Sequence, residues 1–197
     1  MSTSVVLASR NAGKLKEMQA LFAPLGWVLH AVSDFSAHEP DEIESTFAGN
    51  ALLKARHAAR VSGLPAIADD SGLSVDALDG APGVESAYYA GKPSNDKANN
   101  AKLLRELANV PDEKRGAEFV CMMACVRTAD DASPVIAEAR WRGRILWEPR
   151  GTNGFGYDSL FFVPTHRCAS AELPPQVKNE ISHRGQAAAR LLEKLRG

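Results

Sequence analysis

Four segments of this sequence carry residue types that could bind a ligand or do chemistry. The first, Ser9–Lys14, lies between a short apolar run and a segment with helical periodicity. A helix amino terminus offers unpaired N–H groups and a positive dipole, and Lys14 adds a point charge, so the segment suits phosphate. It is not a Walker loop, because Ala8 and Leu15 stand where that pattern needs Gly and Ser or Thr. A plain strand-to-helix turn with a solvated lysine explains the segment equally well.

The second segment is a pair of acids, Asp69 and Asp70, that follows the apolar run Pro65–Ala68 and precedes Ser71 and Gly72. Two carboxylates at a strand end can hold Mg²⁺, which prefers oxygen ligands, and one can orient or deprotonate a water nucleophile. Asp-Ser-Gly is also a common turn composition. We favour the functional interpretation, because a plain turn does not require two acids to crowd each other.

A further acidic stretch contains Glu42 and Glu44, which could supply another ligand. Its local sequence is more typical of a solvated acidic loop.

The third segment, Gly154–Asp158, places two glycines around Phe155. Glycine lets the backbone approach a flat ligand, and the ring offers a stacking face. An aromatic loop that packs on the core is an equally good interpretation.

The fourth segment, Lys178–Gly185, opens the last predicted helix, with Ser182 as its N-cap. His183 and Arg184 would occupy its first turn, where the helix dipole prefers acids, and a ligand site can demand such an unfavourable choice. The alternative is two exposed polar residues.

The elements that must position these segments follow from apolar periodicity and turn residues. Strands and helices alternate, which favours an α/β fold with a mixed sheet. The predicted strands are Ser4–Ala8, Trp27–Ala31, Pro65–Ala68, Leu73–Val75, Ala117–Arg127, Val135–Trp147 and Leu160–Val163. One predicted helix follows the loop Ser9–Gly13. Three others cover Thr46–Val61, Asp96–Leu107 and Ser182–Arg196. No linker or repeat interrupts residues 1–197, so a single domain is expected.

Composition excludes several classes of protein. The chain has 197 residues, 23 Lys and Arg against 24 Asp and Glu, and a formal net charge of −1, which argues against a broad nucleic-acid surface. The longest apolar run, Phe119–Val126, has eight residues, and a membrane span needs about 20. Three cysteines give no disulfide framework. A cytoplasmic protein that does not bind nucleic acid or membranes is therefore expected.

Taken in order, these segments resemble the inosine triphosphate pyrophosphatase family, which acts on non-standard purine nucleoside triphosphates. The resemblance runs from Ser9 to Arg184 and rests on six motifs at compatible spacing. In this sequence they read Ser9-x-Asn11-x-x-Lys14, Thr46-Phe47-x-x-Asn50-Ala51-x-x-Lys54-Ala55, Ala68-Asp-Asp-Ser-Gly-Leu73, Gly80-Ala-Pro-Gly83, Phe155-Gly-Tyr-Asp158 and Ser182-His-Arg-Gly185.

The resemblance implies Mg²⁺-dependent hydrolysis of ITP, dITP and XTP to the nucleoside monophosphate and pyrophosphate. It also implies an elongated α/β homodimer, each chain having two lobes around a central substrate cleft. Asp70 would activate water and bind the metal with Glu42, and Asp69 would support this metal set. The implied substrate contacts are Ser9, Arg10, Asn11, Ala12, Gly13, Lys14, Lys54, Ser71, Phe155, Gly156, Tyr157, Asp158, Lys178, His183 and Arg184.

The sequence departs from the family at Gly49, where Glu is common. The missing acid leaves open whether the metal has its full carboxylate set. It also supports one alternative, a nucleotide-binding regulator of the same fold with weakened catalysis.

Overall fold

The structure is a computed structural model that describes residues 3–10, 12–38, 40 and 43–196, without the side chains of residues 12 and 13. Its strands are β1 Thr3–Leu7, β2 Trp27–Ala31, β3 Ala66–Val75, β4 Gly116–Val126, β5 Val135–Ile145, β6 Phe161–Val163 and β7 Cys168–Ala169. Its α-helices are α1 Ala12–Phe22, α2 Phe47–Ser62, α3 Asp96–Glu106, α4 Pro175–Ile181 and α5 His183–Arg196.

The strands form one mixed sheet in the order β2-β1-β3-β4-β5-β6-β7. Strand β1 pairs in parallel with β2 and with β3, whereas β6 pairs antiparallel with β5 and with β7. The α/β fold with a mixed sheet and flanking helices, predicted from the alternation of elements, is thereby confirmed.

The chain divides into two compact units. The first comprises Met1–Asp70, Cys121–Ala139 and Arg184–Gly197, and the second comprises Ser71–Val120 and Arg140–His183. The expectations of a single domain and of a cleft between two lobes stay predictions.

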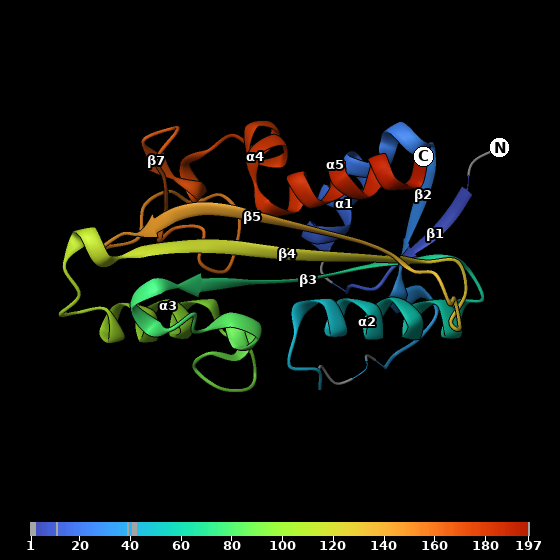
Figure 1. Cartoon of the computed structure of the whole chain (residues 1–197), viewed down its shortest axis with the longest axis horizontal. Coiled ribbons are helices and arrows are strands. Elements are labelled where there is room, and N and C mark those ends of the chain that lie inside the picture. Colours follow the sequence, from blue (N-terminus) through green and yellow to red (C-terminus); the bar gives the residue numbers. More distant parts are fainter. Residues whose placement is uncertain (1–2, 11, 39, 41–42, 197) are drawn as a thin grey trace. The chain divides into compact units, whose positions relative to one another are not determined.

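In the first unit, helices cover both faces of the sheet (Figure 1). Side chains alternate between faces along a strand. Val5 and Ile67 accordingly belong to the core that includes Met18 of α1, whereas Val6 and Ala68 belong to the core formed with α2. The same alternation decides where the two acids of β3 point.

Helix α2 lies against its face of the sheet through alanines. Ala51, Ala55, Ala58 and Ala59 are buried along one side of the helix, and their small side chains pack on residues such as Val6 and Ala68. Gly63 ends the helix in the left-handed region, with a φ of 69°.

The second unit has its own apolar core, in which Leu103 and Leu107 meet Phe119, Trp141 and Phe161. Within the described residues, no helix is long and apolar enough to cross a membrane.

The structure corrects the prediction of two separate short strands, Pro65–Ala68 and Leu73–Val75, on either side of Asp69–Gly72. These residues lie inside the continuous strand β3. Their local preference for a turn is overridden because charged partners from helices satisfy both acids. Strand β7 and helix α4 were not predicted, since the first has only two residues and the second only seven.

Candidate functional site

Asp69 and Asp70 are consecutive residues of β3, so their side chains point to opposite faces of the sheet. Both are buried, at 2% and 6% exposure. Asp69 shares the face of Ile67, which α1 covers, and Asp70 shares the face of Ala68, which α2 covers. The alternation keeps the two carboxylates apart and gives each its own partners.

Asp70 is paired with Lys54 of α2. The Lys54 Nζ atom donates to Asp70 Oδ1 at 2.6 Å, and both side chains are at least 85% buried. The close approach of the alanine face of α2 to the sheet brings Lys54 within reach. A buried ammonium group beside a carboxylate favours the ionised form of both.

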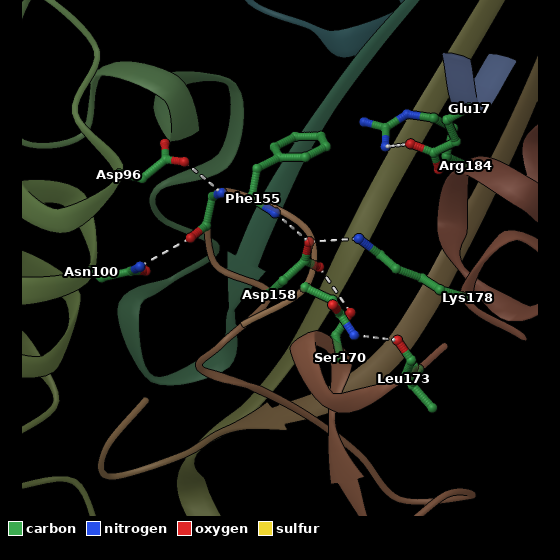
Figure 2. A network of polar contacts seen from close by, with 11 residues as sticks. Glu17, Asp96, Asn100, Phe155, Asp158, Ser170, Leu173, Lys178 and Arg184 are labelled. Atoms are coloured by element: carbon green, nitrogen blue, oxygen red, sulfur yellow. Dashed lines mark hydrogen bonds and ion pairs between the residues drawn. The ribbon is translucent and has the colours of Figure 1, made fainter. Parts of the chain in front are cut away.

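Asp69 lies between two cations on the opposite face. Lys14 Nζ of α1 is 2.8 Å from Asp69 Oδ1, and Arg184 Nε of α5 donates to Asp69 Oδ2 at 3.2 Å. Arg184 also donates through Nη1 to Glu17 of α1 at 3.2 Å (Figure 2). Lys14, Asp69, Arg184 and Glu17 thus form a largely buried network of two cations and two anions.

The network sets the charge of Asp69. Burial alone would raise its pKa, but the attraction of Lys14, Arg184 and Lys54 outweighs this and lowers the pKa of Asp69 well below its usual value. Burial likewise opposes the charged form of Arg184, yet Asp69 and Glu17 raise its pKa. Both groups are therefore ionised at neutral pH.

The loop before α1 is only partly described. Ser9 donates its backbone N–H to Leu7, and the exposed Arg10 donates to the carbonyl of Ser36 at 3.0 Å. Asn11 lies outside the described residues, as do the side chains of Ala12 and Gly13, whose backbone begins the helix. Ser71 follows the acids on β3 and is partly buried.

The start of α2 places Gly49 three residues after the helix N-cap. Thr46 is the N-cap, and its hydroxyl accepts the N–H of Gly49. Thr-x-x-Glu is the spacing of a capping box, in which the Glu reaches back to the N-cap backbone. In this chain, Gly49 keeps the N-cap half of that motif, the bond from its N–H to Thr46, and lacks the acidic half.

Glu44 fills the space above Gly49. A Cβ atom built on Gly49 would lie 2.8 Å from the Glu44 Cβ atom, closer than packing allows. The buried amide of Asn50 holds the backbone of Glu44 in place, since it accepts the Glu44 N–H and donates to the Glu44 carbonyl.

A second group of predicted residues lies in the other unit, around Asp158. This buried carboxylate accepts hydrogen bonds from the backbone N–H of Phe155 at 2.9 Å, from the Ser170 hydroxyl at 2.8 Å and from Lys178 Nζ at 2.6 Å (Figure 2). Gly154 permits this approach, because a Cβ atom there would meet Asp158 Oδ2 at 2.1 Å. Asp158 thus holds the turn in its conformation through hydrogen bonds.

Phe155 and Gly156 form the tip of that turn. The ring of Phe155 is 44% exposed, with Lys178 Nζ 5.5 Å from its centroid. Two side chains of α3 hold the peptide of Gly156: Asp96 accepts its N–H at 2.7 Å, and Asn100 donates to its carbonyl at 2.9 Å.

Two other predicted residues are packed into the second unit. The Tyr157 hydroxyl donates to the carbonyl of Ser86 at 2.8 Å, and burial raises its pKa. The ring of His183 stacks on Phe119 with centroids 4.6 Å apart. Both side chains are about 95% buried in the structure.

Asp70 supplies one carboxylate of the kind that Mg²⁺ prefers as a ligand. One oxygen of that carboxylate is bonded to Lys54. In the described part of the chain, three or more His, Cys, Asp or Glu side chains nowhere gather as a metal site. Glu42, the second predicted ligand, lies outside the described residues.

Residues of these groups that sequence reasoning missed include Glu17, Asp96, Asn100 and Ser170. Glu17 follows Lys14 by three positions, so the two share a helix face, and this spacing could have indicated it. Asp96 and Asn100 lie some 60 positions before Gly156, and their sequence carries no signal for that contact.

Comparison with known proteins bears on both groups. The sequence profile described as "Ham1 family" matches residues 5–194. The chain belongs to the Ham1 family. A curated relative from Pseudomonas syringae pv. tomato, named dITP/XTP pyrophosphatase, is 56% identical over 193 residues, which cover 98% of this chain and 97% of the relative. A second relative of the same name, from Pseudomonas aeruginosa, is 56% identical over 191 residues, which cover 97% of this chain and 96% of the relative.

A solved structure of a Ham1 protein from Coxiella burnetii superposes with a TM-score of 0.90 at 48% identity and covers 98% of each chain. The family predicted from the six motifs is therefore confirmed, and with it the fold class.

Proposed function

We propose that this chain hydrolyses non-standard purine nucleoside triphosphates, namely dITP, ITP and XTP, to the nucleoside monophosphate and pyrophosphate. The observation that carries the proposal is the buried acid pair of β3, in which Asp69 is held by Lys14 and Asp70 by Lys54. The names of the curated relatives support the same reaction.

In the proposed reaction, a water molecule attacks the α-phosphorus, and the bond from this phosphorus to the bridging oxygen breaks. Asp70 orients the water and accepts its proton, and pyrophosphate leaves with the electron pair of the broken bond. Lys14 and Lys54 neutralise charge on the phosphates. Asp69, which Arg184 holds in turn, keeps Lys14 beside the start of α1, where backbone N–H groups suit phosphate.

We propose Asp70 and Glu42 as the residues that would hold Mg²⁺. Asp69 is proposed to support Asp70 and Glu42 indirectly, from the other face of the sheet. Its own two oxygens are paired with Lys14 and Arg184. Bound Mg²⁺ would supply charge neutralisation on the triphosphate and its leaving group. With few protein ligands, most of its coordination falls to water and phosphate oxygens, as is usual for this ion.

Base recognition is proposed for the turn around Phe155, for Lys178 and for Arg184, with Tyr157, Asp158 and His183 as supports. Hypoxanthine and xanthine present a 6-oxo acceptor where adenine has an amino donor, so donors facing that position would be left unpaired by adenine. Arg184 is proposed for this role because a guanidinium group carries five N–H donors and no acceptor.

A cytoplasmic homodimer is the proposed state of the protein. Light scattering on the purified chain tests the dimer, for which the mass should be about twice the 21.1 kDa of one chain.

The test of the function is pyrophosphate release from ITP, dITP, XTP, ATP and GTP, each with Mg²⁺ and with EDTA. We expect preference for the three non-standard nucleotides and loss of turnover in EDTA. Equal use of ATP and GTP would contradict the proposed substrate class. Tight ITP binding without turnover would instead select the regulator with weakened catalysis.

A further inference from the structure

The turn that carries Phe155 combines an exposed ring with a backbone held on both sides. Phe155 is one of few large apolar side chains that are strongly exposed among the described residues, at 44%. In Figure 2 its ring points away from the carboxylate of Asp158, which binds its backbone. Folding of the second unit does not need this ring in its core.

The peptide before Phe155 is fixed by Asp158. The Phe155 N–H donates to Asp158 Oδ2, and Ser170 and Lys178 fix that carboxylate in turn. These bonds are buried or partly buried, so water competes with them little.

The peptide after Phe155 is fixed by α3. Asp96 accepts the Gly156 N–H, which belongs to the peptide directly after Phe155, and Asn100 donates to the Gly156 carbonyl, which belongs to the next peptide. The two side chains are four positions apart and so share one face of the helix. Gly156 has a φ of 60°, a conformation that glycine adopts without strain.

With both neighbouring peptides fixed, the side-chain torsions are the main freedom left to Phe155. A rigid aromatic group loses little conformational entropy when a flat ligand stacks on it. Loss of a hydrogen bond from Asp96 or Asn100 would restore freedom to the turn and lower affinity for the ligand's flat part.

We propose that Asp96 and Asn100 are positioning residues that fix the Phe155 ring for stacking on the purine base. The inference rests on the proposed function, from which it takes the base, and it adds two residues of α3 to base recognition. Asp96 and Asn100 act through Gly156 and touch no reacting atom.

The test is a double-mutant cycle on the full chain with Asp96→Ala, Phe155→Ala and the double variant. Calorimetry measures IMP binding, and inhibition of ITP turnover by inorganic tripolyphosphate reports the phosphate end separately. Each single change should weaken IMP binding about five- to tenfold, the range of a modest stacking loss. The double variant should bind IMP no more weakly than Phe155→Ala, and tripolyphosphate inhibition should stay within about twofold of wild type.

Asp96→Asn and Asn100→Ala extend the cycle, so that the proposal can still be tested if Asp96→Ala is poorly folded. Asn keeps an acceptor oxygen, so Asp96→Asn should recover most of the affinity. Glu113→Ala removes an exposed acid elsewhere in the same unit and should bind IMP as wild type does. Thermal unfolding of every variant verifies folding.

Three outcomes would overturn the inference: IMP affinity within twofold of wild type in Asp96→Ala and Asn100→Ala, multiplying effects in the double variant, or equal losses for IMP and tripolyphosphate. Failure of the proposed function is a different result, namely no ITP turnover by the wild-type chain. The IMP cycle does not depend on turnover, so the two failures are distinguishable.

Discussion

At the scale of single residues, the neighbours Asp69 and Asp70 have different partners, and we propose a different task for each. Asp69 is engaged by Lys14 and Arg184 on one face of β3, whereas Asp70 meets Lys54 on the other. Such different surroundings separate a structural carboxylate from a catalytic one. Two variants test the division.

Replacement of Asp70 by Asn should abolish turnover and preserve binding. The amide cannot accept a proton from water, and loss of a general base costs about 10²–10⁴-fold in rate. Turnover of ITP and calorimetric binding of IMP measure the two effects. Asp130→Asn, at a side chain that is 96% exposed, is the matched control. A variant that retains a tenth of the wild-type rate would exclude Asp70 as the base.

Replacement of Asp69 by Asn should lower the free energy of unfolding and make it depend less on pH in the acidic range. The folded-state pKa of Asp69 is lowered from 3.8, so its stabilisation is present above about pH 4 and is lost as the pH falls further. At pH 7 the variant should lose about 3–5 kcal/mol, because Lys14 and Arg184 remain buried without their acid.

Urea unfolding of wild type and Asp69→Asn between pH 7 and pH 3 provides the measurement. The free-energy difference between them should shrink as the pH falls below 4. A constant difference over the whole range would show that the ion pairs of Asp69 do not stabilise the fold.

At the scale of elements, the start of α2 allows a test of whether position 49 affects helix capping or metal binding. Position 49 is three residues after the N-cap Thr46, and Glu44 occupies the space that a side chain there would need. A capping box at this position would stabilise the helix, and glycine costs about 1 kcal/mol against alanine in a helix.

Gly49→Glu alone should therefore gain little stability, because its Cβ atom would crowd Glu44. The pair Glu44→Gly with Gly49→Glu removes the crowding and should be at least about 1 kcal/mol more stable than Gly49→Glu alone. Thermal unfolding measures this, with Glu44→Gly as the control. The Mg²⁺ concentration for half-maximal turnover should match wild type, and a marked fall would assign position 49 to the metal.

The same scale shows what sequence patterns reveal. Periodicity predicted the helix Asp96–Leu107, observed as Asp96–Glu106, because its leucines repeat on one face. Periodicity predicted two short strands where the structure has the single strand β3, because Asp69–Gly72 have the composition of a turn. The lysines and the arginine that pair with the two acids are distant in sequence. The six motifs predicted most of the candidate site. Asp96 was missed because its partner Gly156 is distant in sequence, whereas Glu17 was missed although it shares a helix face with Lys14.

At the scale of the whole molecule, a net charge of −1 is compatible with binding a polyanion. Lys14, Lys54, Lys178 and Arg184 are mostly buried and each is paired with an acid. Each of these four cations is thus neutralised by an acid beside it, which keeps the net charge of the chain near zero. Buried pairs are screened little by salt, unlike the approach of a charged substrate.

Salt should therefore affect the substrate more than the fold. Between 50 and 500 mM KCl we expect the KM for ITP to rise several-fold, since screening weakens the attraction between triphosphate and lysines. The Tm without substrate should move little. Steady-state kinetics and thermal unfolding at both salt concentrations measure this, and a large fall in Tm with unchanged KM would contradict it.

The alternation of side chains along β3 has a consequence for how such a chain can change over time. Substitutions around Asp69 and Asp70 alter one contact at a time, but one residue gained or lost between Ala66 and Asp69 would turn both acids to the wrong faces. Asp69 would then face α2, and Asp70 would face Lys14 and Arg184. Length in this short stretch should therefore be far less tolerant of change than composition, and insertions should accumulate in loops instead.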